Sequence, residues 1–177
     1  MSDLSEFVAF PKIPRLYREI VITEKLDGTN GCVVIDESGN VRAASRNQWI
    51  TPENDNYGFA KWVESNKFDL LGLGAGRHFG DWYGQGIQRN YGLSEKRFAL
   101  FKRSPNRPDC CEETPMLYQG VFYQEFVDHW INKLFVEGSI AAPGFMRPEG
   151  IVIYHVHARK CFKVLIENDS VSKGASQ

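Results

Sequence analysis

Apolar and polar residues alternate over several short stretches of this chain, and Gly, Asn and Asp residues separate the stretches. Alternation with a period of two is typical of half-buried β-strands, and the separating residues favour turns. The pattern predicts strands at 18–26, 78–83 and 97–101, and hairpins formed by 31–36 with 41–46 and by 150–157 with 159–166.

Apolar residues at helical spacing predict two helices. The first begins after Asn54-Asp55 and ends near Asn66, and the second begins before Phe126 and ends at Gly138. Residues 104–114 are rich in proline and charge, which predicts a loop. The pattern therefore predicts a chain made mostly of strands, with a few helices.

Length and composition indicate one compact domain. The chain has 177 residues, of which 42% are hydrophobic and 13% aromatic, so it can bury one core. No apolar run approaches the roughly 20 residues that span a bilayer, and the polar N-terminus lacks the pattern of a signal peptide. We therefore expect a cytoplasmic protein without membrane contact. The four cysteines lack zinc-binding spacing, so we expect free thiols.

Charge is unevenly distributed. The net charge is −1, which is not the strongly basic balance of many nucleic-acid-binding proteins. Residues 77–107 nevertheless hold seven basic and two acidic residues, interleaved with aromatic residues. This combination suits phosphate contact and base stacking. The segment is a candidate polyanion-binding surface, and an ordinary solvated face is the alternative.

Lys25 is the candidate catalytic residue, in the run Glu24-Lys25-Leu26-Asp27-Gly28-Thr29-Asn30. A lysine amine attacks phosphorus only when it is deprotonated, so it needs surroundings that favour the neutral amine. The run supplies a nearby carboxylate and a turn. Taken alone, the same residues also fit a solvated strand lysine before an Asp-Gly turn.

Five further motifs follow Lys25-Leu26-Asp27-Gly28 in order: Ser45-Arg46-Asn47, Phe79-Gly80-Asp81-Trp82, Phe98-Ala99-Leu100-Phe101, Glu149-Gly150-Ile151-Val152 and Phe162-Lys163-Val164. The series resembles that of the covalent nucleotidyltransferases, a superfamily of DNA ligases, RNA ligases and mRNA capping enzymes. It covers about 13–168 and is most similar to RNA ligases that seal nicks in duplexes.

This resemblance implies an α+β fold, the antiparallel-sheet nucleotidyltransferase fold, ATP-grasp-like, as in the catalytic domains of DNA and RNA ligases and capping enzymes. The adenylyltransferase domain would span 1–169, followed by a flexible tail at 170–177. The chain leaves no room after the last motif for an OB-fold. We therefore expect a minimal catalytic domain.

The resemblance also implies catalytic roles. Lys25 would attack the α-phosphate of ATP and hold AMP as lysyl-AMP, and Lys163 would stabilise the charge that grows on the phosphate. Glu149 would coordinate the metal cofactor, Mg²⁺ or Mn²⁺.

Nucleotide binding is assigned by the same resemblance to six further residues. Phe101 would stack on adenine, Asp81 would contact the ribose, Arg46 would contact phosphate, and Glu24, Asp27 and Asn30 would complete the pocket. Phe98 and Phe101 are an odd number of residues apart and face opposite sides of a strand, so one ring lines the pocket. We expect it to be Phe101.

The implied partner is RNA with a 5′-phosphate and a 3′-hydroxyl, at a nick or splinted junction, joined by a monomeric enzyme. Contacts to the nucleic acid would come from Arg46, Arg89, Lys102 and Arg103. Three positions depart from the family pattern, since most relatives have Glu at Asp81, many have a second lysine at Leu165, and an acidic residue is common at Lys102. A DNA ligase, a GTP-using capping enzyme and a non-catalytic nucleotide- or RNA-binding module remain alternatives.

Overall fold

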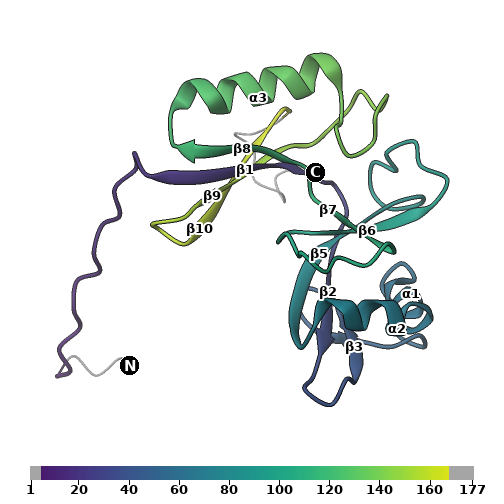
Figure 1. Cartoon of the computed structure of the whole chain (residues 1–177). Helices are drawn as coiled ribbons and strands as arrows, with labels where there is room; N and C mark the ends of the chain where they lie inside the picture. The colour runs from purple at the N-terminus through teal and green to yellow at the C-terminus, as the bar shows by residue number, and fades with distance from the viewer. Residues whose placement is uncertain (1–4, 168–177) are drawn as a thin grey trace.

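The computed structural model describes residues 5–167, which form two mainly antiparallel sheets and the helices that cover them. The smaller sheet has the strand order β10-β9-β1-β8. Its strands are β1 (Glu19–Lys25), β8 (Met116–Val121), β9 (Gly150–His155) and β10 (Lys160–Leu165). Helix α3 (Gln124–Glu137) covers one face of this sheet (Figure 1).

The larger sheet has the strand order β4-β3-β2-β5-β6-β7. Its strands are β2 (Thr29–Ile35), β3 (Val41–Ala44), β4 (Trp49–Ile50), β5 (Gly76–Gly84), β6 (Lys96–Leu100) and β7 (Cys111–Glu113). All neighbours are antiparallel except β6 and β7, which are parallel. Helices α1 (Phe59–Ser65) and α2 (Lys67–Leu70) and the short 3-10 helix η1 (Leu71–Leu73) lie on one side of this sheet.

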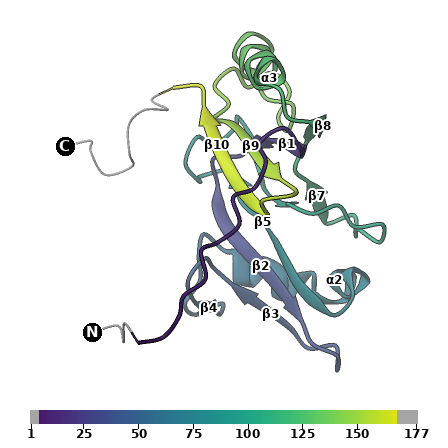
Figure 2. The same ribbon diagram turned by 90° about the vertical axis from the view of Figure 1, so that its left-hand side faces the viewer.

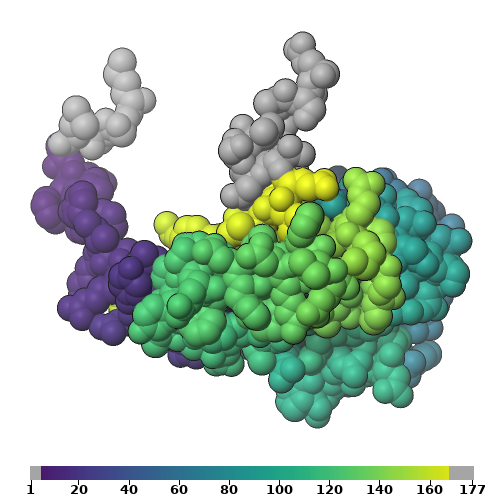
Figure 3. Space-filling model, turned by 90° about the horizontal axis from the view of Figure 1, so that it is seen from above, coloured from purple at the N-terminus to yellow at the C-terminus, as the bar shows by residue number. Residues whose placement is uncertain are grey.

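The chain passes directly from β1 in the smaller sheet to β2 in the larger sheet, through residues 26–28. A view turned by 90° shows β9 and β10 above β2, β3 and β5 (Figure 2). Residues 5–19 are exposed, and the part of this segment before Leu16 projects from the body of the molecule, as the space-filling view shows (Figure 3).

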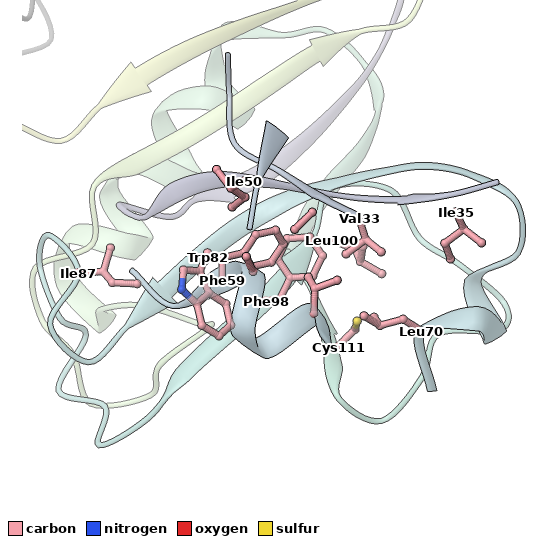
Figure 4. Packing of buried hydrophobic residues seen from close by; sticks show 13 residues of the cluster. Val33, Ile35, Ile50, Phe59, Leu70, Trp82, Ile87, Phe98, Leu100 and Cys111 are labelled. Atoms are coloured by element: carbon pink, nitrogen blue, oxygen red, sulfur yellow. The ribbon is translucent and has the colours of Figure 1, made fainter. Parts of the chain in front are cut away.

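An aromatic cluster between the larger sheet and α1 forms the main hydrophobic core (Figure 4). Phe59 lies at its centre and is fully buried. The centroid of its ring is 4.9 Å from that of Phe98 and 5.5 Å from that of Trp82. A second core fills the space between α3 and the smaller sheet, where Ile20, Ile22 and their neighbours on β9 are buried.

The sequence-based elements are confirmed where a local pattern defines them. The first hairpin is β2–β3, the second is β9–β10, and the helix that carries Phe126 ends before Gly138 as expected. The fold is α+β with mainly antiparallel sheets, and all four cysteines are free. The tail expected at 170–177 lies outside the described residues.

The prediction of a loop at 104–114 was wrong at its C-terminal end, because this segment contains β7. This three-residue strand pairs in parallel with β6 and is too short to show alternation of its own. Strand β8 was also missed, although it forms an edge of the smaller sheet beside β1. Both strands are defined by their partners in the tertiary structure.

We predict that Phe59→Ala lowers the free energy of unfolding by about 3–5 kcal/mol, since it removes a buried ring and leaves a cavity. Phe68→Ala is the matched control, because Phe68 on α2 is 78% exposed. Its expected effect is within about 0.5 kcal/mol. Urea unfolding of both variants measures the difference, and equal losses would contradict this description of the core.

Candidate active site

Lys25 is the last residue of β1 and lies where the two sheets meet. The pleat of β1 puts Ile20, Ile22 and Glu24 on the buried face toward α3 and puts Lys25 on the opposite face. There its amine donates to a carboxylate oxygen of Glu149 at 2.8 Å. The lysine side chain keeps 21% of its exposure, whereas Glu149 keeps only 4%. A partly accessible amine is thus held by a buried carboxylate.

Gly150 follows Glu149 and pairs with Lys25 across the β1–β9 ladder. Its φ is 152°, and a Cβ atom at this position would overlap the carbonyl oxygen of Val164. Only glycine allows β10 to approach so closely. This approach holds β10 beside the Glu149–Gly150 segment, next to the lysine.

Lys163 lies on β10, on the same face of the smaller sheet as Lys25. The register pairs Lys163 with Val152 and Val152 with Thr23, and directly paired residues share a face. Thr23 and Lys25 are two residues apart on β1 and therefore share that face as well. The structure brings both predicted catalytic lysines to one surface. Leu165, across Gly150 from Lys25, belongs to it too.

Glu24 lies on the other side of β1, fully buried. Its carboxylate accepts hydrogen bonds from the hydroxyl of Ser139 at 2.5 Å and from the backbone N–H groups of Ile140 and Ala141 at 2.9 and 3.0 Å. Burial raises the pKa of this carboxyl group, although the hydrogen bonds oppose the rise. The structure therefore separates Glu24 from the amine of Lys25 and uses it to hold the segment after α3.

Asp81 on β5 is buried and accepts a hydrogen bond from the side-chain amide of Asn30 at 3.2 Å. Burial raises the pKa of Asp81 to about 7. The positive charge of Lys25 lowers this pKa, whereas the negative charges of Glu149 and Asp27 raise it further. Asp81 thus interacts electrostatically with the lysine and with the other two carboxylates, so the two sheets contribute to one cluster of charges.

Arg89 joins two segments of this cluster. Its guanidinium donates to the carboxylate of Asp27 at 3.0 Å and to the carbonyl oxygens of Arg147 and Pro148 at 2.9 and 3.5 Å. The hydroxyl of Tyr91 accepts from the backbone N–H of Asp27 at 2.7 Å. The predicted nucleic-acid contact of Arg89 competes with these bonds. The guanidinium links the first motif to the chain just before Glu149.

Gly28 follows Asp27 at the entry to β2. A Cβ atom there would lie 2.5 Å from the carbonyl oxygen of Trp82 and 2.9 Å from the Cβ of Tyr83. The close approach of β5 to this turn accounts for the glycine. It also keeps Asp27 beside the strand that carries Asp81.

Phe101 follows β6 and is half exposed, whereas Phe98 is fully buried in the aromatic core. The expectation that these rings face opposite sides is confirmed. The backbone N–H of Phe101 donates to the carbonyl oxygen of Phe79 at 3.0 Å. This bond sets Phe101 beside β5, on the face that carries Asp81.

Three predicted nucleic-acid contacts lie at the surface. Arg46 is exposed in the turn between β3 and β4, and Lys102 and Arg103 are exposed after β6. Arg103 pairs with Glu113 at 3.6 Å. None of these three side chains has a hydrogen bond to the Lys25 cluster within residues 5–167.

The basic segment 77–107 does not form a continuous cationic surface. Arg97 pairs with Glu95 and Glu112, which lie 2.8 and 3.1 Å away. The guanidinium of Arg107 donates to the backbone carbonyl of Cys111. Several partners come from β7, just beyond the segment in which the charges were counted, so the local excess of charge in the sequence overstated the free positive charge.

Sequence reasoning missed the residues that support the cluster. Tyr91 lies 64 residues from Asp27, and Ser139 lies 115 residues from Glu24. No local motif contains either pair. Tyr91 reaches Asp27 because β5, which precedes it, pairs with β2, and Ser139 reaches Glu24 because the segment after α3 leads into β9, which pairs with β1.

Two general features of the described residues, 5–167, bear on function. No helix in that range is long and apolar enough to cross a bilayer. The same range holds no group of three or more His, Cys, Asp or Glu side chains arranged to hold a metal ion.

Solved structures share this fold. The chain superposes on a Naegleria gruberi RNA ligase variant with ATP and Mn at a TM-score of 0.63 and 18% identity, covering 86% of this chain and 51% of that one. A second variant of that ligase, with AMP and Mn, gives a TM-score of 0.61 and 17% identity, with coverage of 85% and 50%. The chain thus spans about half the length of these structures.

The family itself is shown by the sequence. The family model of RNA ligases matches residues 18–165, so this chain belongs to the RNA ligase family. No curated protein matches the chain.

We predict that Asp81→Asn changes the dependence of stability on pH. From about pH 4 to about pH 7 the unfolded carboxyl group is ionised while the buried one keeps its proton, so the wild type loses stability as pH rises. The variant lacks this dependence, and its amide oxygen can still accept from Asn30. The free energy of unfolding of the variant, measured relative to that of wild type, should rise by on the order of 2 kcal/mol between about pH 5 and about pH 8. Urea unfolding at both pH values measures the gain, and a difference that does not change with pH would refute the assignment.

Proposed function

We propose that this chain is the adenylyltransferase domain, residues 1–169, of an ATP-dependent RNA ligase, and that Lys25 is its nucleophile. The observation that carries the proposal is the contact of 2.8 Å between the amine of Lys25 and the buried carboxylate of Glu149. Membership of the RNA ligase family supports it, as do the ligase structures with ATP or AMP and Mn.

The first step forms a bond between Nζ of Lys25 and the α-phosphorus of ATP. The bond from that phosphorus to the oxygen bridging to the β-phosphate breaks, and pyrophosphate leaves with the electron pair. Lys25 must lose a proton before it attacks. The side chain of Lys25 is partly exposed, so this proton can pass to solvent. The product is lysyl-AMP.

Lys163 supplies positive charge to the same step. It shares a sheet face with Lys25 and lies on β10, which β9 separates from β1. Negative charge grows on the phosphate oxygens as pyrophosphate leaves, and a lysine ammonium fixed beside them stabilises that charge. Lys163 is therefore the second catalytic residue of the proposal.

A divalent ion fits this site by the chemistry of its donors. The charges of Lys25, Glu149 and Asp27 all act on Asp81, so several carboxylates lie near the lysine. Carboxylate oxygens are the ligands that Mg²⁺ and Mn²⁺ prefer, and Mg²⁺ commonly uses one or two of them with substrate phosphates. Glu149 is the proposed ligand. The bound ion would neutralise phosphate charge and favour the neutral amine of Lys25.

The nucleotide would be recognised from the larger sheet. Phe101 offers a half-exposed ring for the adenine, and Asp81 with Asn30 offers polar groups for the ribose and phosphates. Arg46 offers an exposed guanidinium for phosphate. Asp27 supports the pocket through its ion pair with Arg89.

Two further steps would complete ligation. The 5′-phosphate of an RNA end attacks the phosphorus of lysyl-AMP, which frees Lys25 and leaves a 5′–5′ phosphoanhydride. The 3′-hydroxyl of the neighbouring end then attacks the 5′-phosphate, forms the phosphodiester and releases AMP. A nicked or splinted RNA duplex is the proposed substrate, and the monomeric state and cytoplasmic location stay predictions.

We predict that wild type incubated with α-labelled ATP and Mg²⁺ carries label through denaturing electrophoresis, whereas Lys25→Ala carries none. Lys163→Ala should slow labelling by about 10²-fold because it removes one stabilising charge. Lys160→Ala is the matched control on the same strand. The register pairs it with His155, on the face opposite Lys163, so labelling should stay within about twofold of wild type.

Two outcomes would count against the proposal. Wild type that stays unlabelled, even after pyrophosphate removes any AMP already bound, would favour the non-catalytic binding module. Equal loss of labelling in Lys160→Ala and Lys163→Ala would contradict the proposal that Lys163 acts because it shares a sheet face with Lys25. Urea unfolding of each variant separates these outcomes from misfolding.

A further inference from the structure

Helix α1 lies on one side of the larger sheet (Figure 1), and the strand registers place three neighbouring rows of side chains on the opposite face. Residues paired directly across strands share a face, and each row follows from the strand registers. The rows are Asn30–Asp81–Ala99, then Trp49–Ala44–Cys32–Phe79, then Arg42–Val34–Arg77. The first row belongs to the proposed nucleotide site. The other two extend away from it.

The middle row holds two large exposed rings. Trp49 is 43% exposed and Phe79 is 55% exposed, although both belong to strands. The small side chains of Ala44 and Cys32 lie between them in the row. Three strand spacings of about 4.8 Å separate the two rings, or about 14 Å. Two exposed rings at such a separation provide separate stacking surfaces.

The outer row holds two arginines without acidic partners. The guanidinium of Arg42 lies 3.8 Å from the centroid of the Trp49 ring, and that of Arg77 lies 5.9 Å from it. Neither forms an ion pair with any carboxylate in residues 5–167. They differ in this from Arg89, Arg97 and Arg103, which pair with acidic side chains. Positive charge that the protein does not neutralise therefore concentrates beside the exposed rings.

These rows continue the nucleotide site without a break. Phe79 and Asp81 are two residues apart on β5, so their side chains are about 7 Å apart along one face. Phe101, the proposed adenine-stacking residue, is hydrogen-bonded through its backbone to Phe79. Nucleic acid that enters the Lys25 site over this sheet must cross the rings and the arginines.

We propose that this face binds a single-stranded segment of the RNA substrate next to the join, with bases stacked on Phe79 and Trp49 and phosphates held by Arg42 and Arg77. The proposal rests on the proposed RNA ligase function. Stacking rings on an open sheet face, with nearby arginines, recognise unpaired nucleotides, whose base faces are accessible. In a duplex the bases are stacked on each other, so the rings would add nothing to its binding. Of the two proposed substrates, this favours a splinted junction with unpaired nucleotides beside the join over a nick in a continuous duplex.

The test measures binding by fluorescence anisotropy with a labelled single-stranded RNA and with a duplex of the same sequence. Trp49→Leu and Phe79→Leu should each weaken binding of the single strand by roughly 5- to 100-fold and leave duplex binding unchanged. Phe68→Ala is the control, because it removes an exposed ring from α2, on the other side of the same sheet.

Salt dependence tests the arginines separately. Each lost phosphate contact on a single strand lowers the slope of log K against log salt by about 0.7, so Arg42→Gln with Arg77→Gln should lower it by about 1.4. Lys61→Gln on α1 is the control with an equal change of charge per residue, and its slope should match wild type. Both arginines are exposed, so this variant remains informative if a ring variant fails to fold.

Single-strand affinity equal to wild type in the ring variants, or an unchanged salt slope in the arginine variant, would overturn the proposal. Equal losses for single strand and duplex would also overturn it and indicate a general polyanion surface. Labelling of the wild type with ATP needs no RNA and reports on the proposed function by itself. A labelled wild type whose ring variants bind RNA normally would refute this surface alone.

Discussion

The ion pair between Lys25 and Glu149 is the interaction on which the arrangement of the site depends. It joins the end of β1 to the start of β9, and β1 leads directly into β2 of the other sheet. A buried carboxylate without a partner is costly, so Glu149 favours a conformation in which the lysine stays beside it. The constraint keeps the amine of Lys25, the proposed nucleophile, at the boundary of the two sheets.

The side chains of consecutive residues of β1 point to opposite faces of the sheet because a strand is pleated. Glu24 holds the segment after α3 through three hydrogen bonds, and Lys25 points to the site. Slippage of the register by one residue would exchange the two side chains and put the lysine into the core. The buried face of β1, with Ile20 and Ile22, therefore stabilises the position of the lysine as well as the fold.

Arginines divide into two groups by their partners. Arg89 and Arg97 are held by acidic side chains and stabilise the protein, whereas Arg42 and Arg77 contact the ring of Trp49 and have no acidic partner within residues 5–167. An arginine whose charge is already paired contributes less to binding an anion. A count of basic residues along the chain cannot separate the two groups, since their partners lie on other strands.

The sequence by itself determined the hairpins, two helices, the α+β class and the motif that contains Lys25, because each depends on neighbouring residues. The tertiary structure decided what depends on distant ones. Strand β7 exists because β6 lies beside it, and Glu24 is separated from the site because α3 covers its face of β1. Arg89 is bound to Asp27, 62 residues away, and burial raises the pKa of Asp81. Local pattern carries periodicity and turn preference, whereas burial and pairing arise only when the sheets assemble.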